Sequence, residues 1–250
     1  MSKSFRVLFL NVQSPPRARA ALIAEYLRRY DLDSIVLSEL SGAQGSVSLI
    51  AFISALGYKT IWSPPVGRGY SVAIAIKNYE FTVIENIASS GLEPERYQSL
   101  VVHLGKFDLS LFGLYFPSLN VKNLPRRSRD IPFIVNSLER MLQYPDANVL
   151  FGGDINEIPP WHLPRIIDYA AEGYPLHAAI KRLGLVDLAK IHLPPCSYTW
   201  FDRNGGGQLL DGAFVSSSLK YSVDEYYICH EFREAELSDH SGLIVSLLVD

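Results

Sequence analysis

The sequence predicts a single α/β domain over residues 1–250. Short apolar segments typical of β-strands alternate with segments of helical periodicity along the whole chain. Neither a repeat nor a low-complexity linker interrupts this alternation. Such chains fold as β-sheets covered by helices, and a chain of 250 residues is within the usual range for one domain of this kind.

Helices are predicted where apolar residues recur every three or four positions. The first follows Ser14-Pro-Pro16, with Ser14 as the expected N-cap and proline in the first turn. The second ends at Gly57, a residue type that commonly closes helices. The clearest helix spans residues 125–143, and further helical stretches are expected near residues 163–171 and 176–183. Strands are expected at residues 5–12, 34–38, 59–62, 71–77, 81–87, 99–104, 109–115, 147–150, 198–201, 209–215, 222–228 and 243–249.

The most informative segment is Phe151-Gly-Gly-Asp154-Ile-Asn156, which follows an apolar run. Side chains two residues apart on an extended chain point the same way, so Asp154 and Asn156 can converge on one bound group. A carboxylate set against an apolar strand is costly unless it is paired or binds a metal ion. The alternative is that Asp154 caps a helix beginning near Ile155.

The same pattern of polar residues at strand ends recurs three times. Glu39 follows one predicted strand, Asp211 precedes another, and Asp239-His240 precedes a third. The alternative to a functional role is a surface acid for Glu39 and a structural histidine for His240. Taken together with Asp154, the set predicts one site that binds a metal ion and a phosphate group.

These segments, in this order, resemble the endonuclease/exonuclease/phosphatase superfamily, and within it the exonuclease III and abasic-site endonuclease branch. The matching segments are Leu10-Asn11-Val12, Leu37-Ser-Glu39, Leu114-Tyr115-Phe-Pro117, Gly153-Asp154-Ile-Asn156, Tyr198-Thr-Trp200, Leu210-Asp211-Gly-Ala-Phe-Val-Ser216 and Ser238-Asp239-His240. The resemblance extends from Leu8 to Val249. It implies a four-layer sandwich of two mainly antiparallel β-sheets packed face to face, with helices on the outside.

The resemblance also implies catalytic roles. Asp154 orients or deprotonates the attacking water, and Asn156 helps to position that water and the phosphate. His240 donates a hydrogen bond to the scissile phosphate and is oriented by Asp211. Tyr115 contacts the phosphate, with a place in the core as its alternative.

The implied cation is Mg²⁺ or Mn²⁺, held by Glu39 and Asp239 with Asn11 completing the set. Carboxylate oxygens suit such hard cations. Two departures affect this expectation. Gln13 stands where the family usually has an acid, and Ser38-Glu39-Leu40-Ser41 lacks the Gln and Lys that commonly flank this glutamate in the abasic-site branch. Metal preference and abasic-site recognition therefore stay open.

Positive and aromatic side chains are expected around the cleft. Four arginines, one in a glycine-flanked loop and three at the start of the long helix, suit phosphate binding, and a solvated charged turn is the alternative. They are Arg68, Arg126, Arg127 and Arg129. Tyr198 and Trp200 are expected to line the cleft, with plain packing as the alternative.

Composition excludes few functions. The formal net charge of −3 argues against a strongly basic nucleic-acid coat, so polyanion binding must depend on a local patch. Cys196 and Cys229 are too few for a disulfide framework and suggest a reducing compartment. No signal-peptide core and no apolar stretch of about 18–20 residues is present, which predicts an intracellular, cytoplasmic chain without a membrane partner. A monomer without an organic cofactor is expected.

The sequence therefore predicts a Mg²⁺- or Mn²⁺-dependent phosphodiesterase that hydrolyses DNA as an endonuclease or 3′-exonuclease. One alternative is a phosphoesterase acting on a small or lipid-derived phosphodiester, for which the modest basic content leaves room. The other is a catalytically silent binding protein on the same scaffold.

Overall fold

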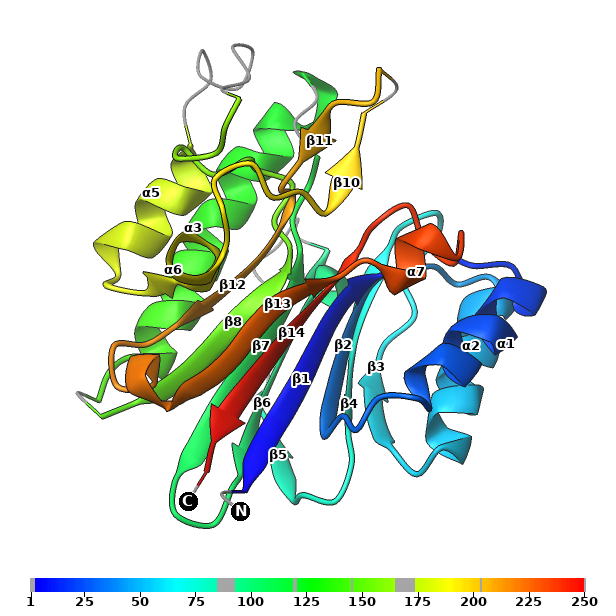
Figure 1. Cartoon of the computed structure of the whole chain (residues 1–250), viewed down its shortest axis with the longest axis horizontal. Coiled ribbons are helices and arrows are strands. Elements are labelled where there is room, and N and C mark those ends of the chain that lie inside the picture. Colours follow the sequence, from blue (N-terminus) through cyan, green and yellow to red (C-terminus); the bar gives the residue numbers. More distant parts are fainter. Residues whose placement is uncertain are drawn as a thin grey trace.

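The fold is built around two β-sheets that pack face to face, with helices on their outer faces (Figure 1). The computed structural model describes residues 3–84, 93–118, 121–144, 146–164, 174–202 and 204–249. Helices α1 (Arg17–Leu27) and α2 (Gln44–Ala55) cover the outer face of one sheet, and α3 (Leu124–Met141) and α5 (Pro175–Arg182) cover that of the other (Figure 1). The short helix α6 (Leu188–His192) contributes Leu188 and Ala189 to the cluster between the sheets. This arrangement confirms the predicted four-layer sandwich.

The first sheet has six strands within the described residues. They are, in order across the sheet, β13 (Val223–Cys229), β14 (Gly242–Leu248), β1 (Ser4–Asn11), β2 (Ser34–Leu40), β4 (Ser71–Ile76) and β3 (Lys59–Trp62). Strands β1 and β2 run parallel, and the other neighbouring pairs are antiparallel.

The second sheet repeats this plan. Its strands are, in order, β5 (Phe81–Val83), β6 (Tyr97–His103), β7 (Asp108–Tyr115), β8 (Asn148–Asp154), β12 (Asp211–Val215) and β9 (Val186–Asp187). Strands β7 and β8 run parallel, and the other neighbours are antiparallel. Each sheet therefore has one parallel pair near its centre, and the two strands of each pair end at the same edge.

Three buried apolar clusters hold the layers together. The largest lies between the sheets and includes Phe9 and Leu150. A second joins α1 and α2 to the first sheet through residues such as Ile23, and a third joins α3 and α5 to the second sheet through residues such as Leu138. Side chains from both faces of the central strands are buried, because each sheet is covered on both sides.

Several local expectations need correction. The residue that precedes α1 as its N-cap is Pro16, not Ser14, whose hydroxyl lies 2.5 Å from that of Ser41. Strand β5 ends at Val83, and the end of that predicted strand and most of the helix expected at residues 163–171 lie outside the described residues. Gly57 has a φ of 95° and follows α2 as expected. The strand expected at residues 198–201 is present as β10 (Trp200–Phe201), but its partner β11 (Gly207–Gln208) and the helix α7 (Glu231–Glu234) were missed by the sequence.

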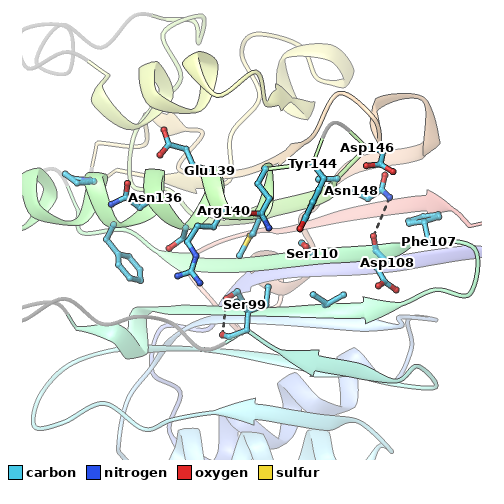
Figure 2. A pocket seen from close by; sticks show the side chains of 18 of the residues that line it. Ser99, Phe107, Asp108, Ser110, Asn136, Glu139, Arg140, Tyr144, Asp146 and Asn148 are labelled. Carbon is cyan, nitrogen blue, oxygen red and sulfur yellow. Dashed lines mark hydrogen bonds between the residues drawn. The ribbon is translucent and has the colours of Figure 1, made fainter.

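A groove of about 1530 Å³ runs between α3 and the outer face of the second sheet (Figure 2). Its lining carries charges of both signs, among them Arg140, Glu139 and Asp146. The lining residues of β7 and β8, such as Asp108 and Asn148, come from the start of these strands. The groove is therefore separate from the edge where the parallel pairs end.

Gly153 allows β8 to approach β7 closely just before its last residue. Its φ is 137°, a conformation that L-residues rarely adopt. A Cβ atom added at Gly153 would overlap the carbonyl oxygen of Leu114, its partner on β7. The glycine before Asp154 is thus required by both the backbone conformation and the spacing between the strands.

We predict that Gly153→Ala lowers the free energy of unfolding more than the control Gly105→Ala. Gly105 has a φ of 93°, but an added Cβ would meet no atom within 4 Å. Backbone strain should cost about 1–3 kcal/mol in either variant. The overlap should cost Gly153→Ala roughly a further 1–3 kcal/mol. Urea unfolding measures the difference, and equal losses would contradict the close-approach argument.

A buried hydrogen bond ties α3 to the second sheet. The Tyr97 hydroxyl donates to Asp130 Oδ2 at 2.6 Å, and both side chains are buried. Burial raises the pKa of Asp130 above its ordinary value of 3.8, although the hydrogen bond from Tyr97 opposes the shift. A carboxyl whose pKa is higher in the folded protein stabilises the fold at low pH, and this contribution is lost as pH rises through the folded-state pKa.

We therefore expect wild type to lose stability relative to Asp130→Asn as pH rises from about 4 towards neutrality. The asparagine keeps an acceptor for Tyr97 but does not ionise. Urea unfolding of both proteins across this range gives the difference in free energy at each pH. A difference that is constant, or that favours wild type more at higher pH, would contradict the raised pKa.

Candidate active site

The edge where the parallel pairs end carries the predicted polar residues. Asn11 and Tyr115 are the last residues of β1 and β7, Asp154 is the last residue of β8, and Glu39 is the penultimate residue of β2. Parallel neighbours bring their carboxyl ends together. A hydrogen bond from Asn11 Nδ2 to Asp154 Oδ2 at 2.9 Å joins the two sheets at this edge.

Antiparallel neighbours bring the remaining residues to the same place. Asp211 opens β12 directly opposite Asp154 in the register. Asp239 and His240 lie just before β14, which runs antiparallel to β1. The fold thus gathers residues that are far apart in the sequence, which confirms the expected convergence of strand ends.

Asp154 is fixed at both carboxylate oxygens. Asn11 donates to Oδ2, and the backbone N–H of Asn156 donates to Oδ1 at 3.0 Å. The side chain is almost fully buried. Burial raises the pKa of Asp154 well above its ordinary value; nearby His240 opposes this shift, whereas Asp211 adds to it.

Asp211 and His240 form a buried pair. His240 Nδ1 and Asp211 Oδ2 lie 2.8 Å apart, and both residues are at most 5 % exposed. Burial favours the neutral imidazole, but Asp211 and nearby Asp154 and Asp239 raise the pKa of His240 to about 10. The pairing at Nδ1 leaves Nε2 for another partner, and a carboxylate in this position fixes the orientation of the ring.

Donor atoms for a cation lie in the same place. Ligand-type atoms of Asp154, Asp211 and His240 lie within 4.8 Å of one another, but Asp211 and His240 already pair with each other. Trp200 Nε1 donates to Asp239 Oδ2 at 3.2 Å, while the buried Asp239 Oδ1 has no hydrogen-bond partner among the described residues. A buried carboxylate oxygen without a donor is costly, and a bound cation would satisfy it. The donor set is rich in oxygen and so fits Mg²⁺ or Mn²⁺.

Glu39 and Tyr115 lie next to each other. Burial raises the pKa of the Tyr115 phenol, and the nearby carboxylates of Glu39 and Asp154 raise it further. The phenol is therefore protonated at neutral pH and can donate a hydrogen bond. Glu39 has a φ of 57°, so the backbone turns sharply at this residue.

Backbone strain is concentrated at this edge. Of the six non-glycine residues with positive φ in the described part of the chain, four lie here. They are Gln13 (47°), Ser14 (39°), Glu39 (57°) and Asn156 (47°). Strained backbone of this kind clusters at functional sites, where the surrounding structure holds it in place.

Gln13, at the position where the family usually has an acid, is exposed and hydrogen-bonded to Arg19. Arg19 Nη1 donates to Gln13 Oε1 at 2.9 Å, and Arg19 Nη2 donates to the Gln13 carbonyl at 2.6 Å. Gln13 N donates to Asn11 Oδ1 at 2.9 Å. Both ends of the Asn11 carboxamide are thereby engaged, which suits an orienting role towards Asp154 better than direct metal ligation.

The structure corrects the placement of Arg127, which was expected on an exposed rim. Its side chain is 3 % exposed and pairs with the buried Glu157, with 2.8 Å between Arg127 Nη2 and Glu157 Oε2. It also donates to the carbonyl oxygens of Pro117 and Asn156, at 2.6 and 3.0 Å. Asn156 Nδ2 donates to the Phe116 carbonyl. Arg127 thus holds the two loops that follow β7 and β8.

The other rim residues differ in their surroundings. Arg68 and Arg129 are exposed, whereas Arg126 forms an ion pair with Glu93. Trp200 binds Asp239 and has its ring 6.5 Å from that of His240. Tyr198 packs against Phe201, with 4.4 Å between the ring centroids.

Two supporting residues were missed from the sequence. Glu157 follows Asn156 directly, but a single glutamate after the motif carries no sign that Arg127 lies beside it. Arg96, far from every motif, has its guanidinium 4.2 Å from the centre of the Tyr115 ring. Neither residue has a pattern in the linear sequence that marks it.

Fold and site together define a hydrolase that acts on phosphodiester bonds. The chain belongs to the Endonuclease/Exonuclease/phosphatase family, whose model matches residues 8–240. This confirms the resemblance inferred from the motifs. Comparison with curated protein sequences gave no match.

Solved structures with the same fold include two AP endonucleases and a 3′ phosphatase bound to DNA. An AP endonuclease from Archaeoglobus fulgidus is 19% identical with a TM-score of 0.77, and the match covers 96% of this chain and 98% of that one. The 3′ phosphatase NExo from Neisseria, bound to a product DNA hairpin, is 18% identical with a TM-score of 0.77, covering 97% and 99%. An AP endonuclease from Leishmania major is 17% identical with a TM-score of 0.78, covering 98% and 88%. At these identities the likeness establishes the fold.

The helices in the described part of the chain were also compared with the requirements of a membrane span. None of them combines the length and the apolar character needed to cross a bilayer.

Proposed function

We propose that the protein is a divalent-metal-dependent phosphodiesterase that hydrolyses DNA, as an endonuclease or a 3′-exonuclease. The observation that carries the proposal is Asp154, held by Asn11, beside the buried Asp211–His240 pair. The AP endonucleases and the DNA-bound 3′ phosphatase with the same fold support DNA as the substrate class. An intracellular monomer stays a prediction.

Glu39 and Asp239 are the residues that would hold Mg²⁺ or Mn²⁺. The unpartnered Asp239 Oδ1 supports this assignment, as does the proximity of Glu39 to the other acids. When bound, such a cation would offset negative charge on the phosphate and on the leaving oxygen.

Asp154 acts on the attacking water in this proposal. A general base is most effective when its pKa lies near the working pH, and burial shifts the pKa of Asp154 in that direction. The hydrogen bonds from Asn11 and from the Asn156 backbone fix the direction of its carboxylate. The water that loses a proton to Asp154 attacks the phosphorus atom, the P–O bond to the leaving oxygen breaks, and that oxygen takes up a proton from solvent water.

His240 and Tyr115 act on the phosphate. His240, protonated and oriented through Nδ1 by Asp211, donates from Nε2 to a phosphate oxygen and offsets the charge that builds up there. Tyr115 donates through its phenol. Asn156, fixed by Phe116 and Arg127, positions the substrate and the water. Positioning and charge stabilisation account for most of the rate enhancement in phosphoryl transfer.

A second candidate function is hydrolysis of a small or lipid-derived phosphodiester. The observation that favours it is the neutralisation of positive charge near the site. Arg126 is paired with Glu93, and Arg127 is buried against Glu157. Together with the net charge of −3, this reduces the basic surface available to a long polyanion.

We expect purified protein to nick supercoiled plasmid with Mg²⁺ or Mn²⁺ and to lose this activity with chelator. Asp154→Asn and His240→Ala should each lower turnover by roughly two to four orders of magnitude, the scale of losing a positioned base or a charge-stabilising donor. Matched controls come from His103 and Asp108, an exposed histidine–aspartate pair, with 2.9 Å between His103 Nδ1 and Asp108 Oδ1.

His103→Ala and Asp108→Asn should leave turnover unchanged, because this pair lies where β6 ends and β7 begins, at the opposite edge of the sheet. Chelator-resistant activity would remove the metal from the proposal. Near-normal turnover by folded Asp154→Asn or His240→Ala would remove the assigned site.

Salt dependence distinguishes DNA from a small substrate. For DNA, the logarithm of the binding constant of Asp154→Asn protein should fall with the logarithm of salt, by about 0.9 per duplex phosphate neutralised. Adding Arg68→Ala should reduce the slope by about one unit, and Arg126→Ala should reduce it by less, because Arg126 already pairs with Glu93. Arg28→Ala, an exposed arginine at the far end of α1, is the control and should leave the slope unchanged. A flat titration, or equal slopes for all variants, would favour the small-substrate alternative.

A further inference from the structure

Arg96 is a buried arginine that contacts Tyr115 in two ways. It ends the 3-10 turn at Pro94–Arg96 and is 5 % exposed. Its guanidinium lies over the Tyr115 ring at 4.2 Å from the centroid, and its Nη1 donates to the Tyr115 carbonyl at 3.0 Å. Arg96 therefore holds both the backbone and the ring of Tyr115.

An ion pair fixes the guanidinium of Arg96 from the other side. Its Nε donates to Glu93 Oε2 at 2.8 Å, and the other oxygen of Glu93 pairs with Arg126 on α3. A planar guanidinium can stack on a ring and donate in its own plane at the same time, which the ammonium of lysine cannot do. The position of Arg96 is thus set by Tyr115 at the end of β7 and by Glu93, which precedes the same turn as Arg96 and pairs with α3 through Arg126.

Two further side chains, Tyr70 and Glu39, lie against the Tyr115 side chain. Tyr70, from the loop that precedes β4, meets the ring edge to face at a centroid distance of 5.8 Å. Glu39 lies at the phenol end. Arg96 covers a face of the ring, so its loss would leave room for the ring to shift while Tyr70 and Glu39 stay in place.

We propose that Arg96 is a positioning residue that aims the Tyr115 phenol at the phosphate of the substrate. The proposal rests on the proposed function, in which Tyr115 contacts that phosphate. Burial of Arg96 and its pairing with Glu93 distinguish this role from direct phosphate binding by Arg96. The guanidinium also places one positive charge beside an edge that is rich in carboxylates.

The test is a double-mutant cycle of Arg96→Met and Tyr115→Phe, with Mg²⁺ and a labelled phosphodiester oligonucleotide. Arg96→Met keeps a long apolar stem but removes the charge and the donors. It should lower kcat about 10- to 100-fold with little change in KM, as misplacement of a contacting group does. If Arg96 acts through the Tyr115 phenol, the double variant should be no slower than Tyr115→Phe alone.

Two further variants serve as a comparison and as a control for the double-mutant cycle. Arg96→Lys retains the charge but cannot stack and donate as a guanidinium does, so it should recover only part of kcat. If Arg96→Met does not fold, Arg96→Lys takes its place in the double-mutant cycle with Tyr115→Phe. Arg6→Met is the control, because Arg6 donates to the Tyr227 hydroxyl at the far end of β1. Arg6→Met should leave kcat unchanged. Losses that multiply in the double variant would show that Arg96 works independently of Tyr115 and would overturn the proposal.

A spectroscopic measurement makes the outcome independent of activity. Tyrosine labelled with ¹³C at Cζ gives a Tyr115 signal that is assigned by its absence in Tyr115→Phe. Arg96→Met should shift or broaden this signal, and Arg6→Met should not. An unchanged Tyr115 signal in folded Arg96→Met would overturn the positioning role. If Arg96→Met shifts or broadens the Tyr115 signal but the wild-type protein hydrolyses no phosphodiester, the proposed function fails. The structural part of the inference, that Arg96 positions the Tyr115 ring, then still stands.

Discussion

The structure depends on the gathering of four carboxylates at one edge of two sheets, of which Asp154 and Asp211 are buried and Glu39 and Asp239 are partly exposed. The parallel pairs β1–β2 and β7–β8 end there, so Glu39 and Asp154 are brought together with Asp211 and Asp239. Burying charge is costly unless it is paired and hydrogen-bonded. His240 offsets part of this charge, but Asp239 Oδ1 is left without a partner among the described residues. The same arrangement that is costly for stability supports the proposed binding of a cation and a phosphate at this edge.

Rigid support keeps this costly arrangement in place. Two buried arginines stack on adjacent aromatics at the end of β7, Arg96 on Tyr115 and Arg127 on Phe116. Each pairs with its own acid, and each donates to a main-chain carbonyl, Arg96 to Tyr115 at the end of β7 and Arg127 to Pro117 in the loop that follows. Precise sites need groups whose conformation is fixed by the surrounding packing. The strained backbone near Asn156 is held in this way, because Arg127 binds its carbonyl directly.

The sequence predicted those features that follow from local pattern. Asp154 was identified because a carboxylate after an apolar strand needs a partner, and the same reasoning found Glu39. Arg127 was misplaced because an arginine in the first turns of an amphipathic helix looks solvent-exposed, and only tertiary packing brings Glu157 beside it. The departure at Gln13 was visible, but its contact with Arg19 depends on a backbone turn with positive φ that no local pattern marks.

The proposed function requires the clustered acids at this edge to bind a divalent cation. Anomalous X-ray diffraction from crystals of the wild-type protein grown with Mn²⁺ would locate that cation. We expect an anomalous peak within coordination distance, about 2.0–2.3 Å, of Glu39 and of the unpartnered Asp239 oxygen. Asp239→Asn crystals should show a weaker peak or none. A manganese peak elsewhere, or crystals that hold the acids unchanged with no peak at saturating Mn²⁺, would contradict the account.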